Sequence, residues 1–160
     1  MSARLDRRES AVRALGEQVQ ELGWTTERIG HVYAEGQGLH PTDFRALTAI
    51  YRAELVGEPL TARGLAASLD LQPSTISYVV DRLVGSGHVT RERDPLDARQ
   101  VILRYAQEGL NVAGRFFGPL AVVHAEALAG FSHVEILTAE RVLAVLVQAL
   151  KGFEHGLRRD

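Results

Sequence analysis

The stretch from Leu60 to Tyr105 constrains the fold most, because it reads as two short helices followed by a hairpin. Thr61 can accept a backbone N–H and so begin the first helix, which ends near Leu69. Pro73 suits the first position of a second helix, and the glycines at 85 and 87 end it. The stretch therefore predicts a helix-turn-helix.

The second helix is predicted to be buried on one side only. Its apolar positions recur at helical spacing and are Ile76, Val79, Val80, Leu83 and Val84. Its polar positions point the other way and are Ser74, Ser77, Tyr78, Asp81 and Arg82. Such a helix can pack on its own core while it offers hydrogen-bonding side chains to a partner.

A hairpin follows the two helices. The predicted strands are His88 to Arg93 and Gln100 to Tyr105, and the dipeptide Asp94-Pro95 marks the turn between them. Two helices followed by a β wing are the order of a winged helix-turn-helix, whose second helix fits the major groove of B-DNA. The predicted fold class is therefore mainly α with a small β wing.

The run from Thr61 to Gly109 closely resembles the MarR family of bacterial transcriptional regulators. The resemblance lies in GLAASL, STISYVVDRL and GHVTRERDPLDARQVIL, which include the wing signature D-P-x-D-x-R at Asp94, Pro95, Asp97 and Arg99. It implies a winged helix-turn-helix with long N- and C-terminal dimerisation helices, in a single domain at 1–160. The DNA-binding region is then expected at 36–106, and the helical dimerisation region at 1–35 and 107–160.

Size and composition agree with one globular domain. The chain has 160 residues, of which 46% are hydrophobic and 24% charged. No apolar run is long enough to cross a bilayer, and MSARLDRRES lacks the apolar core of a signal peptide, so we expect a cytoplasmic protein with no membrane partner. The absence of cysteine excludes disulfides and thiolate metal sites.

The sequence contains no catalytic motif. It lacks a nucleophile elbow, a phosphate-binding glycine loop and a paired-carboxylate motif, so we predict that the protein is not an enzyme and has no cofactor. The histidines at 31, 40, 88, 124, 133 and 155 stand singly, without metal-ligand spacing, and are expected to be surface or structural residues. A site assembled from distant histidines is the alternative, since the MarR family includes zinc-dependent members.

The charge balance limits any DNA-binding surface to a local one. The net charge is -2 and the pI about 6.3, which argue against a generally basic nucleic-acid binder. Between Leu60 and Tyr105 the positive charges come from arginines at 63, 82, 91, 93, 99 and 104. They are nearly balanced in number by acidic residues at 70, 81, 92, 94 and 97. This near-neutrality favours an alternative function, a winged-helix module for protein-protein assembly without a DNA site.

We predict contacts to double-stranded DNA from the second helix and from the wing. The predicted contact residues are Gln72, Ser74, Thr75, Ser77, Tyr78, Arg82, Arg91, Arg93, Asp97 and Arg99. Gln72 lies near the helix N-terminus, where the dipole and free N–H groups favour a phosphate. Tyr78 occupies a position that is often basic in the family, so Arg82 becomes the expected positive contact on this helix.

Near the wing tip, Asp97 and Arg99 are two residues apart. On an extended strand they would project from the same side, so the carboxylate could hold the guanidinium. In the family, the matching arginine enters the minor groove, whose negative potential attracts a cation, and the matching aspartate orients it. The alternative is an exposed ion pair of little consequence.

Both ends of the chain carry apolar heptad stripes. A predicted helix from Ser2 to Glu35 has Val12, Leu15, Val19, Leu22, Thr26, Ile29 and Tyr33 at spacings of three and four. The last helix, after a capping box at Ser132 and Glu135, has Ile136, Ala139, Leu143, Leu146, Leu150, Phe153 and Leu157. The stripes could pack on the chain's own core or on a second subunit. The resemblance favours a homodimer that offers two reader helices to two half-sites.

Two further helices complete the predicted fold. One begins at Pro41, with Asp43 in its first turn, where the helix dipole favours an anion. The other covers much of Gln107 to Phe131, with a kink expected at Pro119. Ala106 departs from the family that the chain resembles, in which many members have a threonine that caps this helix.

Four aromatic residues are candidates for a small-molecule site, namely Trp24, Tyr51, Phe116 and Phe117. MarR-like regulators commonly bind aromatic or phenolic ligands between the dimer helices and the reader head. The resemblance therefore implies a repressor that releases DNA when an aromatic effector binds. Core packing is the alternative role for these residues.

Overall fold

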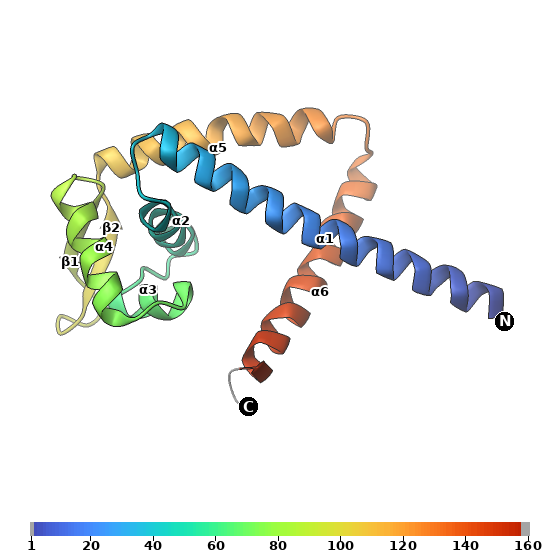
Figure 1. The fold of residues 1–160 in the computed structure, drawn as a ribbon, viewed down its shortest axis with the longest axis horizontal. Helices are drawn as coiled ribbons and strands as arrows, with labels where there is room; N and C mark the ends of the chain where they lie inside the picture. Colours follow the sequence, from blue (N-terminus) through green and yellow to red (C-terminus); the bar gives the residue numbers. More distant parts are fainter. Residues whose placement is uncertain (1, 158–160) are drawn as a thin grey trace. The chain divides into compact units, whose positions relative to one another are not determined.

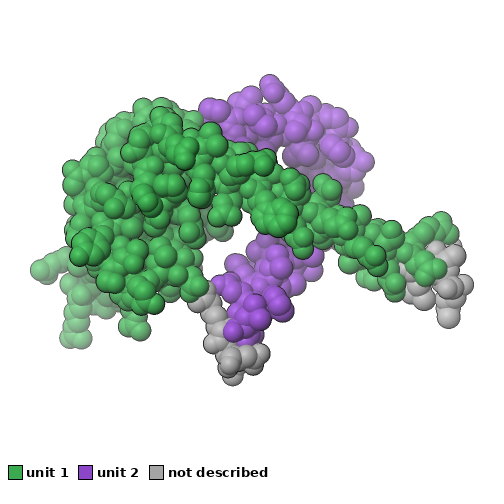
Figure 2. Space-filling model, viewed as in Figure 1, with its two compact units in different colours: residues 1–116 green, residues 117–160 purple. Residues whose placement is uncertain are grey.

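The computed structural model describes residues 2–157, with side chains from residue 6 onward, as helices and one two-stranded sheet (Figure 1). The elements in order are α1 Ser2–Gly36, α2 Pro41–Leu55, α3 Ala62–Leu69, α4 Pro73–Gly85, β1 Val89–Arg93, β2 Val101–Tyr105, α5 Gln107–Ala127 and α6 His133–Leu157. The chain divides into two compact units at 1–116 and 117–160 (Figure 2). This order confirms the predicted fold, mainly α with a small β wing.

The core of the first unit lies between α2, α3, α4 and the wing. Its largest fully buried side chains are Leu47, Ile50, Leu65, Ile76, Leu83, Ile102, Leu103, Val80, Val89 and Val112. The predicted apolar stripe of α4 faces this core, since Ile76, Val79, Val80 and Leu83 are buried. The helix-turn-helix thus gains its stability from burial of one face of each short helix.

The wing is an antiparallel pair of strands with a third segment at its edge. Val89 pairs with Tyr105 and Arg93 with Val101. The Leu103 N–H donates to the Leu60 carbonyl at 2.8 Å, and this places the segment before α3 beside β2. The wing is therefore tied by its backbone to the start of the helix-turn-helix.

Local caps begin the helices where the sequence predicts them. The Thr61 hydroxyl accepts the Gly64 N–H at 3.1 Å at the start of α3. At α6 the Glu135 carboxylate accepts the Ser132 N–H at 2.8 Å, and the Ser132 hydroxyl accepts the Glu135 N–H at 3.4 Å, which confirms the capping box. The Ser132 hydroxyl also donates to the Glu135 carboxylate at 2.6 Å, and this bond, with that from the Ser132 N–H, lowers the pKa of Glu135.

The start of α5 is set by its neighbours rather than by a capping side chain. The Ala106 N–H donates to the His88 carbonyl at 3.0 Å, and the Ala106 carbonyl accepts the Leu110 N–H at 3.0 Å. Gly109 lies so close that a Cβ there would collide with the His88 carbonyl and the Tyr105 ring. Only glycine therefore lets α5 leave the wing along this path. The helix ends at Ala127, four residues before the predicted limit, and Pro119 lies inside it.

The long terminal helices bury little of their apolar surface. In α1 the described side chains before Ala34 are exposed or half-buried, and the glycines at 23 and 30 do not interrupt the helix. None of the residues of α6 is buried. No helix within residues 2–157 combines the length and apolarity that crossing a bilayer requires.

Candidate nucleic-acid interface

The outward face of α4 carries small hydroxyl side chains and one large ring. Ser74, Thr75, Ser77 and Tyr78 are all exposed, and the Tyr78 side chain is 74% accessible. The Ser77 hydroxyl donates to the Pro73 carbonyl at 3.0 Å within the helix, so its oxygen can still accept a hydrogen bond. The predicted contacts of the first two turns of α4 are therefore brought together on one open surface.

The N-terminus of α4 is open. Gln72 occupies the N-cap position with extended backbone angles, and its side chain makes no capping hydrogen bond. Pro73 follows as the first helical residue, as predicted. The backbone donors of the first turn thus have no side-chain acceptor from the cap residue, and an external anion can approach them.

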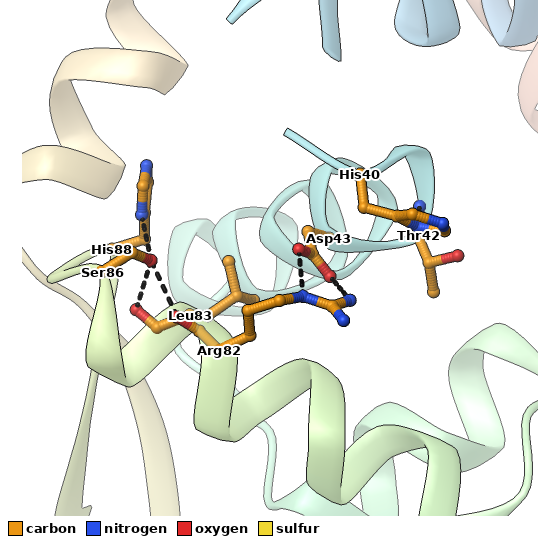
Figure 3. A network of polar contacts seen from close by, with 7 residues as sticks. All are labelled: His40, Thr42, Asp43, Arg82, Leu83, Ser86 and His88. Carbon is orange, nitrogen blue, oxygen red and sulfur yellow. Dashed lines mark hydrogen bonds and ion pairs between the residues drawn. The ribbon is translucent and has the colours of Figure 1, made fainter. Parts of the chain in front are cut away.

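Arg82 is engaged by a buried carboxylate of α2. Its Nε donates to Asp43 Oδ2 at 2.7 Å and its Nη2 to Asp43 Oδ1 at 2.5 Å, a two-pronged contact that Figure 3 shows at the start of α2. The Asp43 side chain is 5% exposed and that of Arg82 53%. This hydrogen bonding, together with the attraction of the carboxylate, raises the pKa of Arg82. The pair joins two helices 39 positions apart in the sequence, and it orients α4 on α2.

This ion pair changes the interpretation of two predicted residues. Asp43 does lie in the first turn of α2, but its carboxylate binds Arg82, whereas the cap of that helix is His40, whose Nδ1 accepts the Thr42 N–H at 3.2 Å. Arg82 lies on the exposed side of α4, yet its guanidinium is held sideways toward α2. Sequence reasoning missed the pair, because charge alone does not reveal a contact between separate helices.

The C-terminus of α4 is closed by a second polar group. The Ser86 hydroxyl donates to the Arg82 carbonyl at 2.9 Å and lies 2.7 Å from Nδ1 of His88 (Figure 3). His88 is 9% exposed. It therefore acts as a packed structural histidine, one of the two roles predicted for such residues. Within the described residues, no three His, Asp or Glu side chains are grouped so that they could hold a metal ion.

Two wing arginines are paired with carboxylates of the helices. Arg91 Nη2 lies 2.5 Å from Asp81 Oδ1 of α4, and both side chains are largely exposed. Arg104 Nη1 lies 3.4 Å from Glu54 Oε1 of α2. These pairs hold the wing against α4 and α2. They also neutralise part of the positive charge that the sequence places in this region.

Arg93 and Arg99 differ from the paired arginines. Both are exposed, and within residues 6–157 neither guanidinium makes an ion pair. They lie on the wing, Arg93 at the end of β1 and Arg99 in the connection to β2. These two guanidinium groups are accordingly the wing cations that a phosphate or a groove can reach.

The wing tip is a turn rather than an extended strand, which corrects the predicted geometry of Asp97 and Arg99. The Asp97 carboxylate accepts the Arg99 backbone N–H at 3.1 Å and the Gln100 side-chain amide at 3.1 Å. These two hydrogen bonds, that from Gln100 foremost, lower the pKa of Asp97. A short polar side chain that binds the backbone two residues on favours a turn over a strand. Asp97 thus positions Arg99 through its backbone, and not through its guanidinium.

The four candidate ligand residues lie in different surroundings. Tyr51 packs edge-on against Tyr105 with ring centroids 5.6 Å apart, whereas Phe116 lies 4.8 Å from Tyr33 and 4.9 Å from Phe44. Trp24 is 68% exposed on α1. Phe117 is half-buried and belongs to the unit at 117–160. The structure therefore brings Tyr51 and Phe116 into separate aromatic clusters.

Tyr105 anchors the wing to the core. Its hydroxyl donates to the Leu47 carbonyl at 2.6 Å, and its backbone N–H lies 3.4 Å from Glu54 Oε2. Burial, with smaller contributions from Glu54 and Tyr51, raises the pKa of Tyr105 above its ordinary value. The hydroxyl therefore remains a donor at neutral pH, and the wing keeps a fixed position on α2.

Comparison with known proteins agrees with this geometry. A model of the MarR family matches residues 37–100, from the start of the α1–α2 connection to the residue before β2. The resemblance to the MarR family is thereby confirmed over the winged helix-turn-helix. The "Uncharacterized HTH-type transcriptional regulator YcgE" of Bacillus subtilis is 33% identical over 84 residues, which are 52% of this chain and 52% of YcgE. The chain thus spans about half the length of this curated relative.

Solved structures extend the likeness to the fold as a whole. A MarR family protein from Bacillus stearothermophilus is 26% identical, with a TM-score of 0.68 over 89% of this chain and 97% of that one. A mutant of S. aureus MepR, solved bound to an oligodeoxyribonucleotide, is 15% identical, with a TM-score of 0.54 over 85% and 97%. The MarR fold therefore includes the long terminal helices as well as the winged helix.

Proposed function

We propose that this chain is a MarR-type DNA-binding transcriptional regulator that acts as a homodimer on a pseudo-palindromic operator. The observation that carries the proposal is the open polar face of α4 beside a wing whose Arg93 and Arg99 are unpaired within residues 6–157. A reader helix and a cationic wing are the parts that a winged helix-turn-helix offers to the two grooves of DNA. The MepR complex with an oligodeoxyribonucleotide supports the same partner.

The homodimer is supported by the apolar surface of the terminal helices. Leu150 and Phe153 of α6 are 55% and 67% exposed, and Val12 and Leu22 of α1 are 56% and 57% exposed. Contiguous apolar stripes of this kind mark surfaces that a partner covers. We infer that residues 1–35 and 107–160 form the dimerisation region and residues 36–106 the DNA-binding region. Two-fold symmetry then places the half-sites about one helical turn apart, roughly 10 base pairs.

Selection of bound fragments from genomic DNA at low salt tests this proposal. We expect an enriched inverted repeat, and inserting about five base pairs between its halves should abolish tight binding, because half a turn rotates one half-site away from its reader helix. Undiminished affinity for the lengthened site would refute a rigid dimer on two half-sites.

A second function, assembly with another protein through the winged helix, is favoured by one observation. The ion pairs of Arg82, Arg91 and Arg104 neutralise much of the positive charge around α4 and the wing. Non-specific DNA affinity follows such charge. Absence of any enriched fragment at low salt would favour this function over DNA binding.

We further propose that the regulator is a repressor that releases DNA when an aromatic effector binds. The family resemblance supports this step, and the aromatic clusters around Tyr51 and Phe116 supply ring surfaces. Titrating the DNA complex with a panel of phenols and aromatic acids tests it. Release of DNA by one of them, and loss of that response in Phe116→Leu, are the expected results.

A further inference from the structure

The first two turns of α4 hold no charged side chain. From Pro73 to Val80 the exposed positions are occupied by Pro73, Ser74, Thr75, Ser77 and Tyr78. The charged residues of α4 come later and both are held by other elements, Asp81 by Arg91 of β1 and Arg82 by Asp43 of α2. In a helix-turn-helix the N-terminal residues of the second helix face the base edges. The part of α4 that faces DNA is therefore uncharged.

This surface suits some bases better than others. Guanine is read most often by an arginine or lysine that binds its O6 and N7 together, and the first two turns of α4 offer neither. Thymine differs from every other base by its C5-methyl group in the major groove, which is read by apolar contact. An uncharged helix with an exposed ring can therefore discriminate a thymine methyl more readily than a guanine.

Tyr78 supplies that ring. It is 74% exposed, whereas Tyr33 and Tyr105 bind the carbonyls of Val112 and Leu47 through their hydroxyls. Among the described residues, the Tyr78 hydroxyl has no such partner. Tyr78 follows Ser74 by four positions, so the two side chains share one face of the helix. The fold thus holds a large aromatic ring in water on the polar face of α4.

We infer that Tyr78 reads thymine, by packing its ring against the C5-methyl of one thymine in each operator half-site. The bases opposite the first two turns of α4 are then A·T pairs, with no guanine held by a cation of this helix. This inference rests on the proposed DNA-binding function and names the base that the reader helix selects. The salt dependence of binding arises instead from phosphate contacts and the wing, because the Tyr78 contact displaces no counterion.

Replacing operator thymines with deoxyuridine tests the inference, because this change removes only the C5-methyl. Once selection has given an operator, each symmetric pair of thymines is replaced in turn. One pair should weaken binding by about 15-fold, since one buried methyl accounts for about fourfold in each half-site. Tyr78→Ala should bind the thymine and uracil operators equally, while Tyr78→Phe should still distinguish them because it keeps the ring.

The matched control is Thr75→Ser, which removes the one exposed methyl group in these two turns and leaves the Tyr78 ring in place. It should leave the uracil effect unchanged. The inference is overturned if no thymine pair is sensitive, if the sensitivity persists in Tyr78→Ala, or if it disappears in Thr75→Ser. Guanines enriched opposite the first turns of α4 would overturn it as well. A different failure, no enriched sequence at all, would reject the proposed DNA-binding function itself.

Discussion

The winged-helix region and the terminal helices differ in the exposure of their leucine side chains. Leu47 and Leu65 of the winged-helix region are 1% and 0% exposed, whereas Leu150 and Leu157 of α6 are 55% and 63% exposed. Burial of a leucine is favourable by about 1.5–3 kcal/mol. The winged-helix region gains this free energy within the chain, whereas the exposed leucines of α6 do not. The winged-helix region thus buries its leucines in its own core, while the exposed leucines of α6 agree with the proposed dimer, in which a second subunit would cover them.

The largest expected effect comes from charging the stripe of α6. The double substitution Leu146→Glu and Leu150→Glu should convert a dimer into a monomer and weaken operator binding by more than about 100-fold, because two linked half-site contacts become independent. Sedimentation and DNA titration measure the two effects. Val145→Glu is the control, since Val145 is 65% exposed but lies off the stripe, and it should remain dimeric. A monomeric parent protein at micromolar concentration would contradict the assignment of the stripe.

The opposite region can be probed with the same residue type. Leu47→Ala should lower the free energy of unfolding by about 2–5 kcal/mol, because it opens a cavity in a closed core. Urea unfolding monitored by circular dichroism measures this. Leu150→Ala should instead lower stability by an amount that varies with protein concentration, since its loss acts through assembly. If both substitutions lowered the free energy of unfolding equally at every protein concentration, α6 would not be stabilised through assembly.

Sequence reasoning located the features that depend on neighbours in the chain. Thr61 and the pair Ser132 and Glu135 cap their helices as predicted, because a cap needs only residues three positions apart. The apolar stripe of α4 is also read correctly from its period. Both kinds of signal are local, and so they survive without knowledge of what the helix packs against.

Features that depend on distant residues were missed or misjudged. The pair of Asp43 with Arg82 joins α2 to α4, and the sequence of neither helix indicates that the other lies beside it. The cluster of Tyr33, Phe44 and Phe116 arises in the same way, from three different helices. The predicted geometry of Asp97 and Arg99 was wrong for another reason. Their spacing of two was interpreted on an extended strand, but Asp94 and Asp97 bind backbone N–H groups and form turns.

Within the winged-helix region, the ion pair of Arg82 involves a buried carboxylate, whereas that of Arg91 is exposed. Arg82→Ala leaves the Asp43 carboxylate, whose side chain is 5% exposed, without its cation, and should cost about 1–3 kcal/mol of unfolding free energy. Arg91→Ala is the matched control, because its pair with Asp81 is largely exposed and should be worth at most about 1 kcal/mol. Adding Asp43→Ala to Arg82→Ala should recover part of the loss. No recovery in the double variant would show that the two residues are not coupled.

The smallest effect on the fold, and the clearest on DNA, is expected at the wing tip. Arg99 is exposed and unpaired within residues 6–157, so Arg99→Ala should leave thermal unfolding unchanged. Binding should still weaken markedly, because a guanidinium is attracted to the negative potential of a narrow minor groove. If Arg99 releases one counterion, the dependence of log affinity on log salt concentration should fall by about one unit.

Two substitutions at Asp97 separate its role in the turn from a role through charge. Asp97→Asn keeps an oxygen that can accept the Arg99 N–H, so binding should stay close to that of the parent protein. Asp97→Ala removes this acceptor and frees the turn, and should weaken binding, though less than Arg99→Ala does. Titrations of all three variants over a salt series provide the measurement. If Asp97→Asn binds as weakly as Asp97→Ala, the carboxylate acts by its charge. If Arg99→Ala binds as tightly as the parent, the wing is not a DNA contact.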